Sequence, residues 1–287
     1  MSSPYDYCLE VVRKRDYEHY LCTLLLPSPQ RSAVFALRAL NVETASVRDH
    51  ITQTQIGERK LGFWYDIIRR AYTTDNRILL EHPLALALTL SIREYNLSQS
   101  WLLRLINARM RELTIGSFKE MSCLEEYSED THGSILFLTL ETAGIKSIEI
   151  DHAASHLAKA AGIVTCLRAV APLAGRRGRV GIPISLLNEY KVSQQDVLRR
   201  SNLSGLREVA IVMGSIAKLH LEKGISLVSN QTQKYPLIKR VFLCSVVYNS
   251  FLNRLERSNF NLFDNRLQSR DGMLLFRFII KLIKKKL

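Results

Sequence analysis

The chain has 287 residues, and a hydrophobic content of 47% is enough to bury a substantial core. The 13 glycines and 7 prolines suit long helices rather than many turns. The sequence has no uninterrupted run of about 18 apolar residues, so we expect no membrane-spanning helix. The net charge of +13 favours acidic partners, namely nucleic acid, anionic lipid or a diphosphate, and it also suits a mitochondrial matrix protein.

The sequence argues against a zinc site, a visible transit peptide and nucleic-acid binding. The five cysteines include no C-x-x-C pair, so buried reduced thiols are favoured over a zinc site. Residues 1–6 resemble neither an arginine-rich presequence nor a secretory signal, so we see no transit peptide in this chain. No basic motif is interleaved with aromatic residues, so we predict no nucleic-acid binding despite the charge.

Apolar residues recur at helical spacing along almost the whole chain, and no segment shows the alternation of a strand. The first helix is predicted over residues 5–26, where Pro27 stops it. Further helices are predicted from near residue 30, at 58–72, 83–95, 101–113 and 122–142, from near 150, and at 206–228 and 236–258. No shift in composition marks a boundary, so we predict a single all-α domain over residues 1–287.

Polar residues and glycine mark several helix ends. Ser98 is a predicted N-cap, and Ser122 with Glu125 has the spacing of a capping box. Ser193 opens a short helix in the same way, and Gly144 is the predicted end of the helix over 122–142.

His152 and His156 lie four residues apart on a predicted helix, which is a spacing that a metal site can use. No third protein ligand is evident in the sequence, and the H-E-x-x-H pattern is absent. We therefore expect surface or hydrogen-bonded core histidines and no metal here.

The segment 162–183 carries the most specific pattern in the chain. It contains Leu167 and Arg168 on a helix, and then a basic turn with Gly178, Arg179, Val180 and Pro183. This order resembles a signature of the squalene/phytoene synthase family, a helix reading N-I-L-R-D-V-x-E-D followed by R-R-G-R-V-Y-L-P. Residues 20–27 and 31–40 are also similar to the opening segments of that family.

Other residue types replace most of the family's metal-binding aspartates in this chain. Its D-D-x-x-D motif falls on Ala45, Ser46 and Asp49, and the two aspartates of its second motif fall on Ala169 and Leu173. Enzymes of this family ionise an allylic diphosphate with Mg²⁺, which requires oxygen ligands. One remaining acid cannot hold a metal cluster, so we expect no metal, no cofactor and negligible prenyl transfer.

The resemblance implies an isoprenoid-synthase-like helical bundle around a central cavity. Residues 13–18, 37–43, 151–156 and 162–168 resemble a catalytically inactive mitochondrial branch of the family. That branch implies a non-enzymatic protein at the matrix face of the inner membrane, where it contacts complex I subunits or assembly intermediates early in assembly.

Two other functions stay open. A prenyltransferase with a rearranged site would use Asp49, Glu129 and Arg168, whereas a passive protein would bind a prenyl diphosphate or lipid without turnover. One interpretation of Arg168, Arg176, Arg177 and Arg179 is a relic anion site, because guanidinium groups suit phosphate oxygens. The alternative is a solvated basic turn and one helix arginine that pairs with an internal acid.

A basic amphipathic helix is predicted over residues 272–287. The side chains expected to contact anionic lipid are Arg277, Phe278, Lys281, Lys284 and Lys285. The alternative is that the apolar side of this helix packs on the domain, and the two arrangements can hold together.

Overall fold

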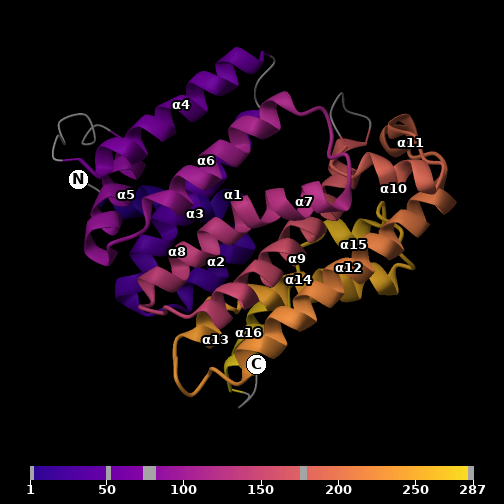
Figure 1. The fold of residues 1–287 in the computed structure, drawn as a ribbon. Coiled ribbons are helices and arrows are strands. Elements are labelled where there is room, and N and C mark those ends of the chain that lie inside the picture. The colour runs from indigo at the N-terminus through magenta and orange to yellow at the C-terminus, as the bar shows by residue number, and fades with distance from the viewer. Residues whose placement is uncertain (1–2, 50–52, 74–81, 175–179, 284–287) are drawn as a thin grey trace.

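The computed structural model describes residues 3–49, 53–73, 82–174 and 180–283. Every regular element in these ranges is a helix, which confirms the predicted all-α fold (Figure 1). No helix in these ranges combines the length and the apolar character that crossing a bilayer requires.

The helices follow one another through short connections. The first half contains α1 (Pro4–Arg15), α2 (Tyr17–Leu24), α3 (Ser28–Asp49), α4 (Thr54–Ala71), α5 (Pro83–Tyr95), α6 (Gln99–Thr114), α7 (Met121–Ser128), the π-helical turn η1 (Glu129–Gly133) and α8 (Ser134–Thr142). The second half contains α9 (Ile148–Leu173), α10 (Ile184–Glu189), α11 (Gln194–Arg199), α12 (Leu203–Ser229), α13 (Ile238–Val241), α14 (Cys244–Arg257), α15 (Asn265–Gln268) and α16 (Leu274–Ile283). The predicted bounds of α5 are correct, and those of α4, α6 and α12 are close.

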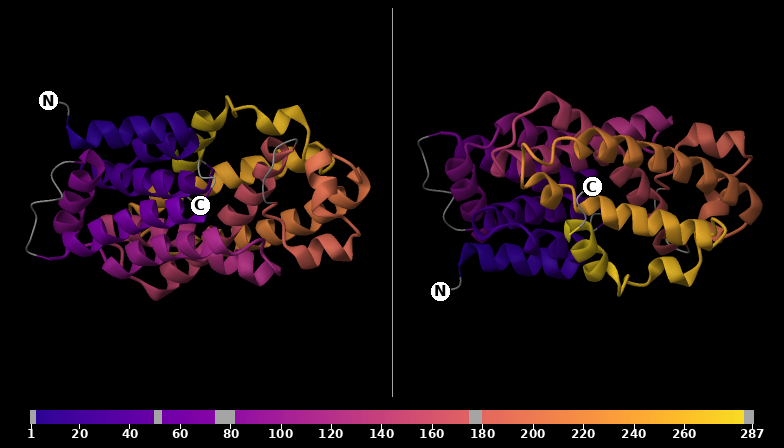
Figure 2. Two further views of the ribbon diagram at one scale, coloured as in Figure 1. Left: turned by 90° about the horizontal axis from the view of Figure 1, so that it is seen from above. Right: turned by 90° about the horizontal axis from the view of Figure 1, so that it is seen from below.

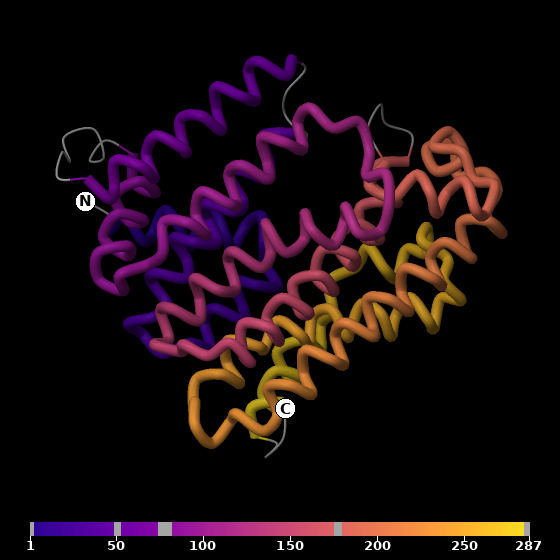
Figure 3. Tube along the Cα trace, in the orientation of Figure 1, coloured from indigo at the N-terminus to yellow at the C-terminus, as the bar shows by residue number. Residues whose placement is uncertain are grey.

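Five long segments lie side by side in the order α4, α6, α7–α8, α9 and α12 (Figure 3). The remaining N-terminal helices pack at one end of this array, and α14 to α16 pack against the other (Figure 2). The buried apolar side chains form two clusters, one centred on α3 to α6 and one on α9, α12 and α14. This division leaves charged side chains between the two clusters, where the candidate site lies.

Two long predicted helices are interrupted. The chain bends at Asp16, whose backbone leaves the helical region at φ −140°, so that α1 and α2 replace one helix over 5–26. A helix over 236–258 is also wrong, because short turns separate α13 from α14. At both places tertiary packing overrides the helical spacing of the sequence.

Between α7 and α8 the predicted helix over 122–142 continues, but it widens into the π-helical turn η1. The hydroxyls of Thr131 and Ser134 donate to the carbonyls of Tyr127 and Asp130, both at 2.7 Å. These bonds occupy backbone acceptors around the turn, and π-helical turns often occur where a helix carries functional side chains.

The predicted helix ends differ in outcome. The capping box of Ser193 with Asp196 and the stop at Gly144, which has φ +68°, are confirmed. Ser98 does precede α6, but its hydroxyl donates to Glu141 at 2.5 Å instead of capping. The capping box at Ser122 is wrong, because α7 begins at Met121.

Glycines allow α9 to pack closely on its neighbours. A Cβ atom on Gly162 would lie 2.3 Å from the Cβ of Ser128 in α7, and one on Gly224 of α12 would lie 2.9 Å from the carbonyl oxygen of Ala153. The helix that carries the second motif position is therefore held tightly from both sides.

Candidate functional site

The two motif positions of the sequence lie on α3 and α9. Ala45 and Ala169 carry only methyl groups, and the hydroxyl of Ser46 donates to the carbonyl of Glu43 at 2.9 Å. Leu173 is apolar, and the side chain of Asp49 lies outside the described residues. Within the described residues, no group of three or more histidines, cysteines, aspartates or glutamates is placed to hold a metal ion.

Arg48 extends from the first motif towards α9. Burial raises the pKa of the Cys166 thiol on α9 to about 12, and the nearby charge of Arg48 acts against that rise. The guanidinium of Arg48 donates to the carboxylate of Glu112 on α6, whose side chain is 7% exposed. The guanidinium of a residue beside the first motif is therefore paired inside the protein.

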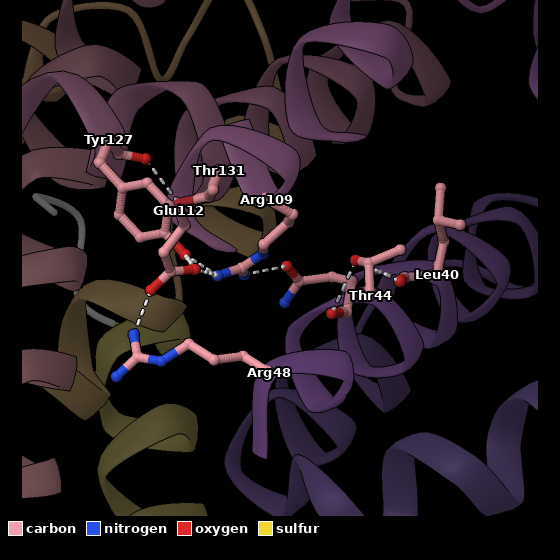
Figure 4. Close-up of polar contacts among 8 residues, drawn as sticks. Leu40, Thr44, Arg48, Arg109, Glu112, Tyr127 and Thr131 are labelled. Atoms are coloured by element: carbon pink, nitrogen blue, oxygen red, sulfur yellow. Dashed lines mark hydrogen bonds and ion pairs between the residues drawn. The ribbon is translucent and has the colours of Figure 1, made fainter. Parts of the chain in front are cut away.

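Glu112 is the centre of a buried polar network (Figure 4). Its carboxylate accepts from the Tyr127 hydroxyl and lies 3.7 Å from the guanidinium of Arg109. Arg109 also donates to the Tyr127 oxygen and, at 3.1 Å, to Oδ1 of Asn41. The network thus joins α3, α6 and α7 through side chains that are far apart in sequence.

In this network one carboxylate lies between two guanidinium groups. Burial disfavours the ionised form of Glu112, but the adjacent Arg109 and Arg48 outweigh it and lower the pKa of the carboxyl group. Burial raises the pKa of the Tyr127 phenol, which therefore stays a proton donor. An ionised glutamate with two guanidinium partners is poorly placed to bind Mg²⁺ or to act as a base.

A second polar group lies where α2 approaches α14. His19 bridges the carboxylate of Asp16 at 2.7 Å and the hydroxyl of Tyr248 at 2.9 Å. Burial opposes ionisation of Asp16, but His19 and Arg38 lower its pKa to about 2. These contacts connect α2 to α14, whose residues are 229 positions apart at His19 and Tyr248.

Arg168 forms an ion pair with Glu18 of α2 at 2.5 Å. This arrangement matches the alternative interpretation, in which the arginine of the signature pairs with an internal acid. Arg176, Arg177 and Arg179 lie outside the described residues, so the relic anion site stays a prediction. Glu129, the other proposed remnant, lies 3.9 Å from the Lys159 ammonium.

His132 of η1 lies near the cations of both polar groups. Burial lowers its pKa, and the charges of Arg109, His19 and Arg38 lower it further, to about 3. The imidazole is therefore neutral in the folded protein at physiological pH, while an unfolded chain would titrate near 6.5.

The predicted pair of histidines acquires a third member, His220 of α12. The Nδ1 atoms of His156 and His220 lie 2.8 Å apart, and Nε2 of His220 lies 3.4 Å from the carboxylate of Glu125. One of the two imidazoles donates in the contact between His156 and His220, and the other accepts. Burial and the charges of the neighbouring histidines lower the pKa of His156 to about 4.

Acidification is expected to destabilise the protein below about pH 6.5, because the unfolded chain then takes up protons that the folded chain excludes. For His132 the loss approaches about 1.4 kcal/mol per pH unit. Urea unfolding followed by circular dichroism between about pH 7 and 5 measures this slope. The His132→Asn variant should have a shallower slope, and an unchanged slope would show that His132 is not held neutral.

The sequence contained signals for part of the polar network around Glu112. Arg109 and Glu112 have the i, i+3 spacing of an ion pair on one helix, and Tyr127 matches a family motif. The partner of Arg48 carried no such signal, because Glu112 is 64 residues away.

Comparison with known proteins relates this geometry to a family. A family model described as squalene/phytoene synthase matches residues 12–272. The chain is 40% identical over 281 residues to a Bos taurus protein named NADH dehydrogenase (ubiquinone) complex I, assembly factor 6, covering 98% of the chain and 82% of the relative. The Homo sapiens protein of that name is 41% identical, with coverages of 93% and 78%. A Drosophila melanogaster homolog is 38% identical, with coverages of 96% and 82%.

Solved structures share the arrangement of helices. A squalene synthase from Alicyclobacillus acidocaldarius superposes with a TM-score of 0.76 at 18% identity, covering 90% of this chain and 95% of that chain. A dehydrosqualene synthase determined with a ligand gives a TM-score of 0.80 at 16% identity, covering 97% and 95%. At these identities the likeness concerns the fold alone, and it confirms the predicted synthase-like bundle.

Proposed function

This chain belongs to the squalene/phytoene synthase family, and we propose that it acts without catalysis as an assembly factor for mitochondrial respiratory complex I. The relatives that share about 40% of its residues carry that role in their name. The observation that supports the non-catalytic part is the pairing of Glu112 with Arg48, beside the first motif, and with Arg109.

Prenyl transfer needs cations that are free to neutralise a departing diphosphate. Metal ions supply that charge only where several carboxylates converge, and Ala45, Ala169 and Leu173 contribute none. Arg48, Arg109 and Arg168 are positively charged, but each is already paired with a carboxylate of the protein, Arg48 and Arg109 with Glu112 and Arg168 with Glu18. These ion pairs stabilise the fold, but they do not suit the turnover of a prenyl diphosphate.

The proposed location is the matrix face of the mitochondrial inner membrane, where the protein associates peripherally. The excess of 40 basic over 27 acidic residues suits an anionic surface. The proposed partners are complex I subunits or early assembly intermediates, which the protein contacts directly.

Depletion of the protein from the cells that express it tests this function. Native gels of mitochondrial complexes should show selective loss of complex I, with complexes III and IV as internal controls, and re-expression should restore it. Intact complex I after complete depletion would overturn the assembly function.

A passive binder of prenyl diphosphate is the second candidate, and it would require Arg168 to exchange the carboxylate of Glu18 for phosphate oxygens. Calorimetry with inorganic pyrophosphate tests it. A heat of binding that the wild-type chain shows and the Arg168→Ala variant lacks would support retained diphosphate binding. The absence of a heat of binding with the wild-type chain would reject this second function.

A further inference from the structure

Helix α16 is anchored on the domain by one of its sides. Leu274 and Phe278 are buried, and the helix packs on α14 and α2. Asp271, just before α16, accepts from the Ser250 hydroxyl of α14 and lies 3.5 Å from the guanidinium of Arg277. The predicted lipid contact of Phe278 is therefore wrong, because this ring is 0% exposed within the apolar core.

The opposite side of α16 is also apolar, and it is exposed. Its side chains range from 37% to 77% exposed and comprise Met273, Leu275, Phe276, Ile279, Ile280 and Ile283. Phe276, Ile280 and Ile283 follow one another at spacings of four and three residues, so they form one stripe. A stripe of this kind on an otherwise polar surface marks a surface that another molecule covers.

Cations outnumber acids in the sequence around this stripe. Residues 272–287 contain Arg277, which pairs with Asp271, then Lys281, and then Lys284, Lys285 and Lys286, which lie outside the described residues. A second copy of the chain would bring two such sets of cations together, which disfavours a dimer through this side. An apolar stripe in a segment with an excess of cations fits the interface of an anionic lipid membrane.

We propose that α16 docks the protein on an anionic membrane by inserting Leu275, Phe276, Ile279, Ile280 and Ile283, while Leu274 and Phe278 hold the helix on the domain. This inference deepens the peripheral membrane location proposed above and does not depend on the role in complex I assembly. One apolar side of α16 packs on the domain and the other inserts into the membrane. The helix therefore fixes the orientation of the whole domain on the membrane and does not act as a flexible tether.

Flotation of the purified protein with vesicles tests the proposal. The wild-type chain should float at least tenfold more with vesicles of phosphatidylcholine and cardiolipin than with phosphatidylcholine alone, and added salt should weaken it. Combined Phe276→Glu and Ile280→Glu substitutions should abolish flotation. Leu219→Glu is the matched control, because Leu219 is 68% exposed on α12 and lies outside the stripe.

Thermal unfolding of each variant shows whether the domain is intact, and the milder pair Phe276→Gln and Ile280→Gln replaces the glutamates if the first pair unfolds early. Flotation of the stripe variants at the wild-type level would overturn the proposal. A wild-type chain that does not float would overturn it too, whether or not it dimerises. Purified protein and lipid suffice for this experiment, so its failure leaves the assembly function to be judged by the native gel.

Discussion

Replacing Glu112 by alanine is expected to lower the free energy of unfolding by about 3–5 kcal/mol, which is the typical cost of breaking a buried ion pair by removing one partner. The substitution leaves Arg109 with a side chain only 12% exposed and without its carboxylate. It also removes the acceptor of the Arg48 guanidinium and of the Tyr127 hydroxyl. Urea unfolding followed by circular dichroism measures the change.

Two controls separate charge from packing at this position. Glu112→Gln keeps the size of the side chain but removes the charge, so it should be nearly as destabilising as Glu112→Ala. Tyr127→Phe removes one hydrogen bond and leaves the ion pairs, so it should cost only about 1 kcal/mol. Equal and small effects of all three substitutions would contradict the account of a network centred on Glu112.

Replacing Gly162 by alanine is expected to cost about 3 kcal/mol, at the upper end for overpacking. The new Cβ would lie 1.8 Å from Oγ and 2.3 Å from Cβ of Ser128, which is fully buried. Since Ser128 belongs to a neighbouring helix, α7 and α9 must separate to relieve the clash. Thermal unfolding monitored by circular dichroism measures the loss of stability.

Second substitutions at Ser128 test the cause of that loss. Ser128→Gly removes both clashing atoms and should restore a large part of the stability in the Gly162→Ala background. Ser128→Ala removes only the hydroxyl and keeps the Cβ contact of 2.3 Å, so it should restore less. Independent, additive effects of the paired substitutions would show that the two residues are not in contact.

The helical fold was predictable because apolar spacing is a local property of the sequence. The bounds of α5 between Pro83 and Tyr95 and the capping box at Ser193 follow from neighbouring residues alone. The bend at Asp16 was not predictable in this way, because its carboxylate is held by His19, which in turn bonds Tyr248 from a distant helix.

The loss of the metal-binding aspartates was predictable from the sequence, and the i, i+3 spacing of Arg109 and Glu112 was a signal for one ion pair of the candidate site. The substitutions at Ala45 and Ala169 are visible in the sequence and argue against a metal cluster. The ion pair of Arg48 with Glu112 replaces the charges of the family's aspartates. It depends on how α3 packs against α6, which no local sequence pattern encodes. The side of α16 that faces the domain was likewise misassigned at Phe278, since both sides of that helix are apolar.

We propose that this protein supports complex I assembly without prenyl transfer, and Asp49 is the acid that remains at the first motif. The most direct test expresses Asp49→Ala in depleted cells, at a protein level matched to wild type by immunoblot, and quantifies complex I on a native gel. Full rescue is the predicted result. Loss of rescue with a stable, equally abundant variant would contradict the claim and would point to chemistry at this acid.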